Sequence, residues 1–250
     1  SSESESTNVG ATPLEKVDIP QAEFPLSASQ QTIWQQSRTN PGSSLGHRVC
    51  SVRLAATVNT DRLRHAFEAL FKRHPMLTVV MRETQGQVVQ SLRKDVVPES
   101  QEVVLIGAAQ SQVDAALAAE VNRPFDLQQG PLTRLSVFRL PDQSLQLVLT
   151  SHAIVADSWS MSLLMQDLLE GYASQASGAS CNSPSADYSY EDFVAWEEKQ
   201  ESAASITRCL DFWKRELQDA PAQLALPTDH ARLKVPSLSG GEFGFQLDDE

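Results

Sequence analysis

The chain of 250 residues carries a formal net charge of −12, has an isoelectric point near 4.8 and is 41% hydrophobic. This is the composition of an ordinary globular protein, and the length suits one large domain or two small ones. Nucleic acids and anionic membranes attract clustered Lys and Arg, so the acidic balance argues against both as partners. No stretch approaches the ~20 apolar residues of a membrane helix, which argues further against a membrane.

The three cysteines, Cys50, Cys181 and Cys209, are scattered through the chain. They show neither metal-ligand spacing nor the even count of a disulfide framework, so we expect a reducing, cytoplasmic environment and no metal. The sequence also lacks a glycine-rich phosphate-binding loop, paired zinc ligands and a Gly-x-Ser-x-Gly elbow. We therefore expect no cofactor bound by the chain itself.

Three polar stretches predict the domain organisation. Residues 1–24 are rich in Ser, Glu and Pro without hydrophobic periodicity, which is typical of an interdomain linker. Residues 174–187 predict a surface loop, and a stretch containing Pro and Gly begins at residue 226. We therefore expect one lobe over residues 25–225, followed by a connector over residues 226–250.

Between these stretches, helical periodicity alternates with strand-like patterns. The clearest helix is predicted between an N-cap at Asn59 or Thr60 and Pro75, because its apolar residues recur at i, i+3, i+4, i+7 and i+8. Strands interleaved with helices predict an α/β fold, with helices packed on one face of a mixed β-sheet. In chain order, the other expected elements are a helix over 29–38, a strand within 47–58, strands over 77–82 and 87–92, a helix over 110–121, strands over 132–140 and 145–150, and helices over 161–172, 190–202 and 206–217.

One segment, from Thr150 to Ser160, places His152 and Asp157 where a predicted strand ends and a predicted helix begins. Such a junction can direct a His/Asp pair into a cleft. Alternatively, Asp157 or Ser158 is only the helix N-cap and His152 a strand-end histidine satisfied by its neighbours. Residue types alone favour this second interpretation. Of the other histidines, His74 is expected to complement a helix dipole, and His47 has no evident partner.

The same segment resembles the His-His-x-x-x-Asp-Gly signature of nonribosomal peptide synthetase condensation domains, aligned on residues 152–158. Further motifs that resemble this family follow in the family's order. They are Pro25-Leu26-Ser27-Ala28-Ser29-Gln30 with Trp34, Arg73-His74-Pro75-Met76-Leu77, Phe125-Asp126-Leu127 with Gly130-Pro131-Leu132 and Arg134, Asp187-Tyr188 with Trp196, and Phe212-Trp213 with Leu226-Pro227-Thr228-Asp229. Together they make the chain similar to the N-terminal lobe of a condensation domain, from about residue 25 to its end.

This resemblance implies a chloramphenicol-acetyltransferase-like fold of two lobes with an active site between them. It implies that acyl or peptidyl carrier domains deliver donor and acceptor on phosphopantetheine arms, and that an amide bond forms. In the family the second histidine of the signature acts on the acceptor amine. The aspartate of the signature is an organiser that pairs with an arginine.

The chain departs from the signature at the second histidine, where it has Ala153. A methyl group can neither accept nor donate a proton, and positioned acid–base catalysis contributes roughly 10²–10⁴-fold, so we expect a severe loss of activity. His152 occupies the first histidine position and is expected to point to the opposite face from Ala153. The remaining motif residues are His152, Asp157, Trp159 and, in place of the signature glycine, Ser158.

Two hypotheses about function follow from the resemblance. The first is a degenerate, truncated condensation domain of a nonribosomal peptide synthetase or hybrid polyketide–peptide synthase, with a structural or carrier-docking role. The second is an excised lobe, or a His-to-Ala variant, of an active domain that joins carrier-bound acyl and aminoacyl thioesters. Thr78 and Val80 stand where the family often has arginines, which favours the first. The chain stops at Glu250, where the resemblance places the start of the second lobe.

Overall fold

The computed structural model describes residues 14–16, 23–177, 187–200, 203–221, 224 and 226–231. The chain divides into two compact units, residues 1–202 and 203–250, which are described separately. The second unit contains helix α6 (Ala203–Glu216), and the other helices and strands of the described residues belong to the first. The expected bounds of the linker, lobe and connector stay predictions.

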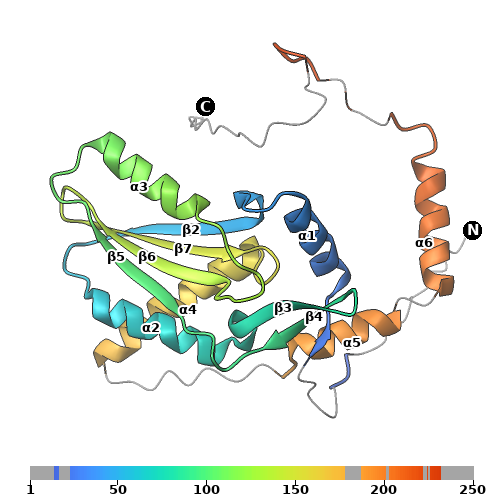
Figure 1. Ribbon diagram of the computed structural model, residues 1–250, viewed down its shortest axis with the longest axis horizontal. Helices are drawn as coiled ribbons and strands as arrows, with labels where there is room; N and C mark the ends of the chain where they lie inside the picture. The colour runs from blue at the N-terminus through green and yellow to red at the C-terminus, as the bar shows by residue number, and fades with distance from the viewer. Residues whose placement is uncertain are drawn as a thin grey trace, which may run out of the picture. The chain divides into compact units, whose positions relative to one another are not determined.

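The main sheet of the first unit has four strands in the order β2-β7-β6-β5 (Figure 1). Strand β2 pairs antiparallel with β7, β7 pairs antiparallel with β6, and β5 pairs parallel with β6, so the sheet is mixed. In this register His47 lies directly opposite His152, which brings two histidines far apart in sequence to one end of the sheet. The strand bounds are β2 His47–Leu54, β5 Glu99–Val104, β6 Thr133–Arg139 and β7 Leu145–His152.

Helices α2 (Thr60–Arg73) and α4 (Ser158–Ser177) pack on one face of this sheet, and α3 (Gln110–Asn122) packs on the other (Figure 1). Side chains alternate along β7, so Leu147 joins the core beneath α2 and α4, whereas Val148 joins the core beneath α3. The predicted α/β class and mixed sheet are confirmed. Helices α2 and α4 fit the prediction of helices on one face. Helix α3 adds a layer on the second face, where β6 and β7 are buried as well.

A smaller antiparallel sheet has the order β1-β4-β3, and helix α1 follows its first strand. Helix α5 joins this region through its first residue, because the Tyr190 hydroxyl lies 3.0 Å from the Ser27 hydroxyl at the N-cap of α1. The bounds are β1 Phe24–Pro25, α1 Ala28–Thr39, β3 Val79–Thr84, β4 Gln87–Leu92 and α5 Tyr190–Gln200, with 3-10 helices at Ser44–Gly46 and Pro75–Thr78.

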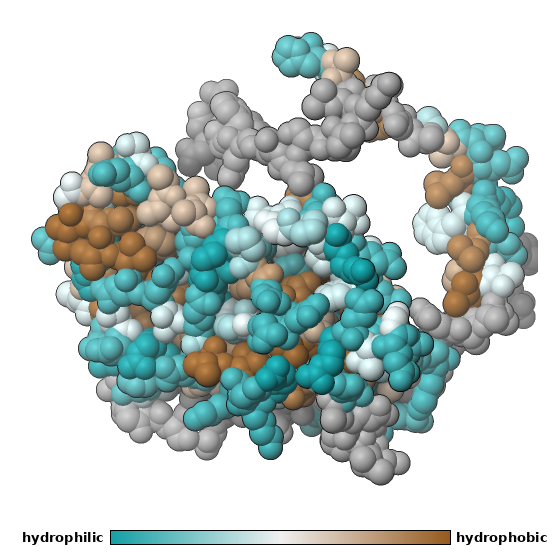
Figure 2. Space-filling view, viewed as in Figure 1, coloured by the Kyte–Doolittle hydropathy of each residue, from teal (hydrophilic) through white to brown (hydrophobic). Residues whose placement is uncertain are grey.

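The structure differs from the predicted elements in strands β1, β3 and β5 and in the length of α4, which extends to Ser177. Strand β5 is not among the predicted elements, because Glu99-Ser100-Gln101-Glu102 offers no apolar alternation, and pairing with β6 at the sheet edge stabilises it instead. The strand expected from Leu77 begins at Val79, because Pro75 starts a 3-10 turn. Figure 2 shows an apolar patch over the end of β5 and the loop that follows, where Val104 and Ile106 are exposed.

Polar contacts join the C-terminal end of α2 to α4. His74 is the C-cap of α2, and its Nε2 lies 2.6 Å from one carboxylate oxygen of Asp167 in α4. The Arg73 guanidinium lies 3.0 Å from the other oxygen. The expectation for His74 therefore missed its main contact, because Asp167 lies 93 residues away in the sequence.

No helix in the described part of the chain is both long and apolar enough to cross a membrane.

Candidate functional site

The signature segment forms a tight turn between β7 and α4. His152 is the last residue of β7, and the next three residues form a turn closed by a hydrogen bond of 3.0 Å from Val155 N–H to the His152 carbonyl. The N–H of Ala153 donates to the carbonyl of Gly46 at 2.7 Å, and the N–H of His152 donates to the carbonyl of Leu132 at 2.9 Å. Backbone bonds on two sides therefore fix the position of Ala153.

A buried glutamine pair holds the turn from a third side. The Gln30 side chain donates from Nε2 to the Ile154 carbonyl at 2.9 Å and exchanges hydrogen bonds with Gln90. Both glutamines are nearly inaccessible to solvent, so their paired amides avoid the cost of unsatisfied buried polar groups. Gln30 also completes the capping box of α1 with Ser27. The Pro-Leu-Ser-x-x-Gln segment therefore has a physical role, which is to tie α1 to the signature turn.

Asp157 is the N-cap of α4, as one of the two sequence interpretations predicts. Its Oδ1 accepts hydrogen bonds from the backbone N–H and the hydroxyl of Ser160, both at 2.7 Å. These bonds lower the pKa of the Asp157 carboxyl below its ordinary value. Within the described residues it forms no ion pair with arginine, and the organiser role that the resemblance implies stays a prediction.

Removing this cap should destabilise the protein. Asp157→Ala is expected to lower the free energy of unfolding by about 0.5–2 kcal/mol, whereas Asp157→Asn, which can still cap, should cost less. Thermal unfolding of both variants measures the difference. A higher melting temperature for Asp157→Ala would show instead that the carboxylate is an unfavourable remnant of a lost ion pair.

His152 is buried and held in place, with only 5% of its surface exposed. Its Nδ1 accepts a hydrogen bond from the Ile154 N–H at 3.2 Å. Burial, aided by the positive potential of His47 and Arg48, lowers the pKa of His152 to about 4, so the ring is neutral at pH 7. The His152 side chain therefore packs in the interior and bonds to its own turn, as expected for a strand-end histidine.

Gly46 leaves the space that the His152 ring needs. A Cβ atom on Gly46 would lie only 2.5 Å from Nε2 of His152. Gly46→Ala should therefore displace the ring and lower the free energy of unfolding by roughly 1–3 kcal/mol. Gly171→Ala is the matched control. Gly171 lies inside helix α4, and a Cβ atom there would make an ordinary contact of 3.5 Å with Ala66 of α2. That variant should lose no stability, and an equal loss in both would contradict the packing argument.

The other signature residues lie at the surface of the turn. Ala153 is half-buried, whereas Trp159, in the first turn of α4, has 75% of its surface exposed. Ser158 is the first residue of α4 and has no positive φ, so a glycine is not required there.

His47, which has no evident partner in the sequence, has one in α3. Its Nδ1 lies 2.6 Å from the carbonyl of Val121, near the C-terminus of that helix. The ring also contacts Phe125 edge-on, with centroids 5.0 Å apart, and lies 6.4 Å from the ring of His152. No local sequence pattern marks this cluster, because it depends on the register of β2 against β7 and on the position of α3.

A cleft of about 520 Å³ opens above this cluster. We call it the His47 cleft; the end of α1 and the segments that follow α1 and α3 form its walls, and His47 and His152 lie among its lining residues. Beneath Phe125, the Arg134 guanidinium stacks 4.0 Å from the ring centroid. Arg134 is itself buried and donates to Glu120 at 2.7 Å, so the Gly-Pro-Leu-x-Arg motif stabilises the floor of this region.

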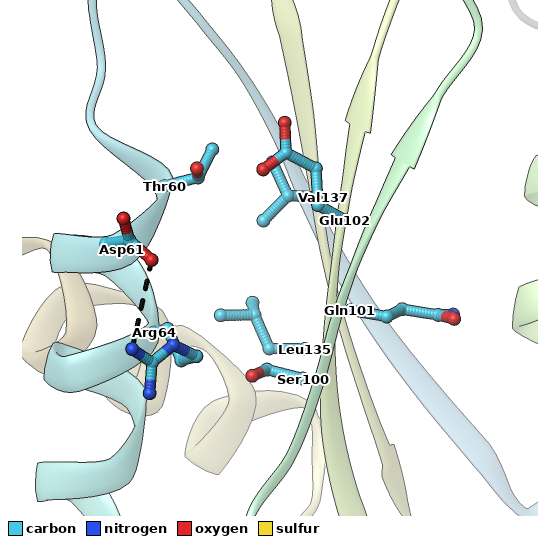
Figure 3. A pocket seen from close by; sticks show the side chains of 8 residues that line it. All are labelled: Thr60, Asp61, Arg64, Ser100, Gln101, Glu102, Leu135 and Val137. Atoms are coloured by element: carbon cyan, nitrogen blue, oxygen red, sulfur yellow. Dashed lines mark ion pairs between the residues drawn. The ribbon is translucent and has the colours of Figure 1, made fainter.

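A smaller pocket of about 130 Å³ lies between α2 and strand β5 (Figure 3). Leu135 faces it from the sheet, whereas Gln101 points away to the other face, where it bonds Glu120. Of its three charged residues, Asp61 and Arg64 lie 3.8 Å apart, and Glu102 pairs with Arg139 at 2.9 Å. The lining of this pocket has no imidazole or thiol, in contrast to the His47 cleft.

The mixed sheet with a signature turn leading into α4 defines a chloramphenicol-acetyltransferase-like lobe. Solved structures with this fold agree. The X-domain in its complex with OxyB from teicoplanin biosynthesis superposes with a TM-score of 0.75 at 25% identity, covering 91% of this chain and 50% of that one. The starter condensation domain of rhizomide synthetase RzmA gives a TM-score of 0.69 at 16% identity, covering 81% and 49%.

The chain belongs to the condensation domain family, which matches residues 20–250. Phosphinothricin tripeptide synthetase PhsC of Streptomyces viridochromogenes is 31% identical over 89% of this chain. Malpinin synthetase of Mortierella alpina is 30% identical over 94% of it. The chain spans 21% and 3% of the lengths of these synthetases and about half of the solved chains. The predicted resemblance is confirmed.

Proposed function

We propose that this chain is a condensation-domain lobe that does not form amide bonds and instead docks a carrier domain within a cytoplasmic peptide or polyketide–peptide synthetase. The carrier would bring its own phosphopantetheine arm, so the chain needs no cofactor of its own. The observation that carries the proposal is Ala153 at the position of the family's second histidine.

The surroundings of Ala153 support this proposal. The neighbouring His152 is buried, bonded at Nδ1 and neutral, so it is poorly placed to replace the missing imidazole. Thr78 and Val80 also stand where arginines are common in the family, and Val80 is packed in the interior at 1% exposure. An apolar contact at a position where the family often has an arginine is in accord with a lobe released from catalytic constraint.

A solved relative supports a docking role. The X-domain, which is similar to this chain in sequence and fold, was solved in complex with another protein, OxyB. A domain with a similar fold over half of its length can therefore bind a protein partner. For this chain, the partner we propose is a carrier domain of the synthetase to which the chain belongs.

One experiment tests both halves of the proposal. The chain is mixed with donor- and acceptor-loaded carrier domains encoded beside it. Mass spectrometry then measures carrier-bound products, and calorimetry measures carrier binding in the same buffer. We expect binding without a new amide. An amide above the protein-free control would favour the rival hypothesis of an active lobe, and absence of binding to both carriers would overturn the docking role.

A further inference from the structure

Strand β5 forms one edge of the main sheet. It runs parallel to β6, and among the described residues no other strand pairs with it. An edge strand presents a row of unpaired N–H and C=O groups that a further strand can complete, and proteins commonly protect such edges with charges, prolines or bulges. The end of β5 and the start of the next loop have no such protection, because their sequence is Val103-Val104-Leu105-Ile106.

The backbone bonds of β5 show which of its groups point outward. The N–H of Leu105 donates to the carbonyl of Arg139 in β6 at 2.8 Å, so it points into the sheet. The direction of the backbone groups alternates along a strand, so those of Glu102 and Val104 point away from β6. Within the described part of the chain, no loop forms a backbone hydrogen bond with them. This side of β5 is therefore open to another strand.

The side chains around this edge supply apolar surface and room. On the side of helix α2, Val104 is 62% exposed and Ile106 is 58% exposed, and the apolar patch of Figure 2 covers this end of β5. The pocket of about 130 Å³ separates α2 from β5 on the same side (Figure 3). On the opposite side, Val103 and Leu105 pack against the core beneath α3. An added strand could extend the apolar contacts on both faces.

The charges at this edge favour a second copy of the chain as the added strand. Arg139 lies beside Val104 in the sheet register and donates from two nitrogens to Oε1 of Glu102, at 2.9 and 3.2 Å. Antiparallel pairing centred on Val103 places Glu102 of each copy opposite Val104 of the other. Each Glu102 then comes close to the Arg139 of the other copy, so carboxylates and guanidinium groups alternate across the junction.

We propose that two copies of this chain associate through antiparallel pairing of their β5 strands, around a two-fold axis near Val103. The two main sheets would join into one continuous sheet, with the same residues on both sides of the interface. The other edge strand, β2, is less suited to this pairing because Arg48 and Arg53 lie along it. The inference depends neither on carrier docking nor on the loss of amide formation.

Sedimentation equilibrium of the 250-residue chain over a dilution series tests the proposal. We expect the measured mass to rise from 27.4 kDa towards twice that value as the concentration increases. Val104→Glu sets like charges opposite each other at two symmetric places, so it should raise the dissociation constant of the dimer by about 10-fold or more. Val49→Glu is the matched control on the β2 edge, where the valine is 42% exposed, and should leave the constant unchanged.

Two further measurements identify strand pairing as the cause. Val104→Pro removes an outward N–H without removing a bond to β6, so it should also give monomers. Circular dichroism establishes that each variant is folded, and either Val104 variant is sufficient if the other does not fold. In the unmodified chain, amide exchange at Glu102 and Val104 should slow at high concentration, because their N–H groups become bonded in the dimer.

Three results would overturn the proposal. The unmodified chain could remain monomeric at every concentration, or the folded Val104 variants could dimerise as it does. A dimer in which the amides of Glu102 and Val104 exchange as fast as in the monomer would place the interface elsewhere. Carrier binding is measured separately by calorimetry, so its failure would leave these results unaffected.

Discussion

Arg134→Met is expected to lower the free energy of unfolding by about 3–5 kcal/mol. Arg134 has only 2% of its surface exposed, and it donates to the Glu120 carboxylate and to the carbonyls of Glu120 and Arg123 at 2.6–2.8 Å. Methionine fills similar space but leaves the buried carboxylate of Glu120 with one partner fewer. Urea unfolding followed by tryptophan fluorescence gives the change in free energy.

The controls separate buried charge from loss of packing. Replacing both partners, in Arg134→Met with Glu120→Leu, should cost less than Arg134→Met alone, because the buried carboxylate is removed with its partner and Arg123 keeps its pair with Glu99. Arg64→Met, which breaks the exposed pair with Glu68, should cost at most about 0.5 kcal/mol. If Arg134→Met loses no more stability than Arg64→Met, the buried network does not stabilise the lobe.

Acidification from pH 7 to pH 4 should cost the folded protein about 3 kcal/mol through His152 alone. Its pKa is about 4 in the folded chain, chiefly because of burial, against an ordinary value of 6.5. Between these values the unfolded chain binds the proton and the folded chain does not. The contribution of His152 is therefore complete above pH 6.5 and declines as the pH falls towards 4.

His152→Asn isolates this effect, because its Oδ1 can replace Nδ1 as the acceptor for Ile154 while the side chain no longer titrates. The variant should be less stable at pH 7 but should show a flatter decline between about pH 6.5 and pH 4.5. Glu120 affects the stability of the protein in a separate, lower pH range. Burial opposes its ionisation, but bonds from Arg123 and Arg134 outweigh this and lower its pKa, so its contribution is lost only below about pH 4.5. If the free energy of unfolding of His152→Asn fell with pH as steeply as that of the unmodified protein, the attribution of this pH dependence to His152 would be contradicted.

The elements with strong local patterns could be predicted from the sequence. Helix α2 begins after Asn59, whose side chain accepts from the Arg62 N–H, and its apolar stripe is buried, as predicted. Strand β5 could not be found, because its polar residues are stabilised by pairing with β6 and by Arg139, which bonds Glu102. Such contacts depend on the tertiary fold and leave little trace in local composition.

In the candidate site, too, some features follow from local sequence and others depend on tertiary contacts. The turn that holds His152 and the cap at Asp157 follow from local sequence, because both lie at a strand-to-helix junction. The His47 cleft requires β2 to pair with β7 in one register and α3 to place Val121 next to His47. The buried bond from Gln30 to Ile154 spans 124 residues, and only the family resemblance marked that glutamine as important.

The proposed loss of activity depends on Ala153 occupying the position of a catalytic imidazole. To test this, amide formation by the whole natural protein that contains this chain is compared with Ala153 and with Ala153→His, using loaded carrier domains and mass spectrometry. Ala153→Gln is the control, because it adds a polar side chain that cannot take a proton at neutral pH. We expect no turnover with Ala153 or Gln, and a gain of about 10²-fold or more with His. Turnover by the unmodified protein, or no gain with His, would show that Ala153 is not the site of a lost catalytic base.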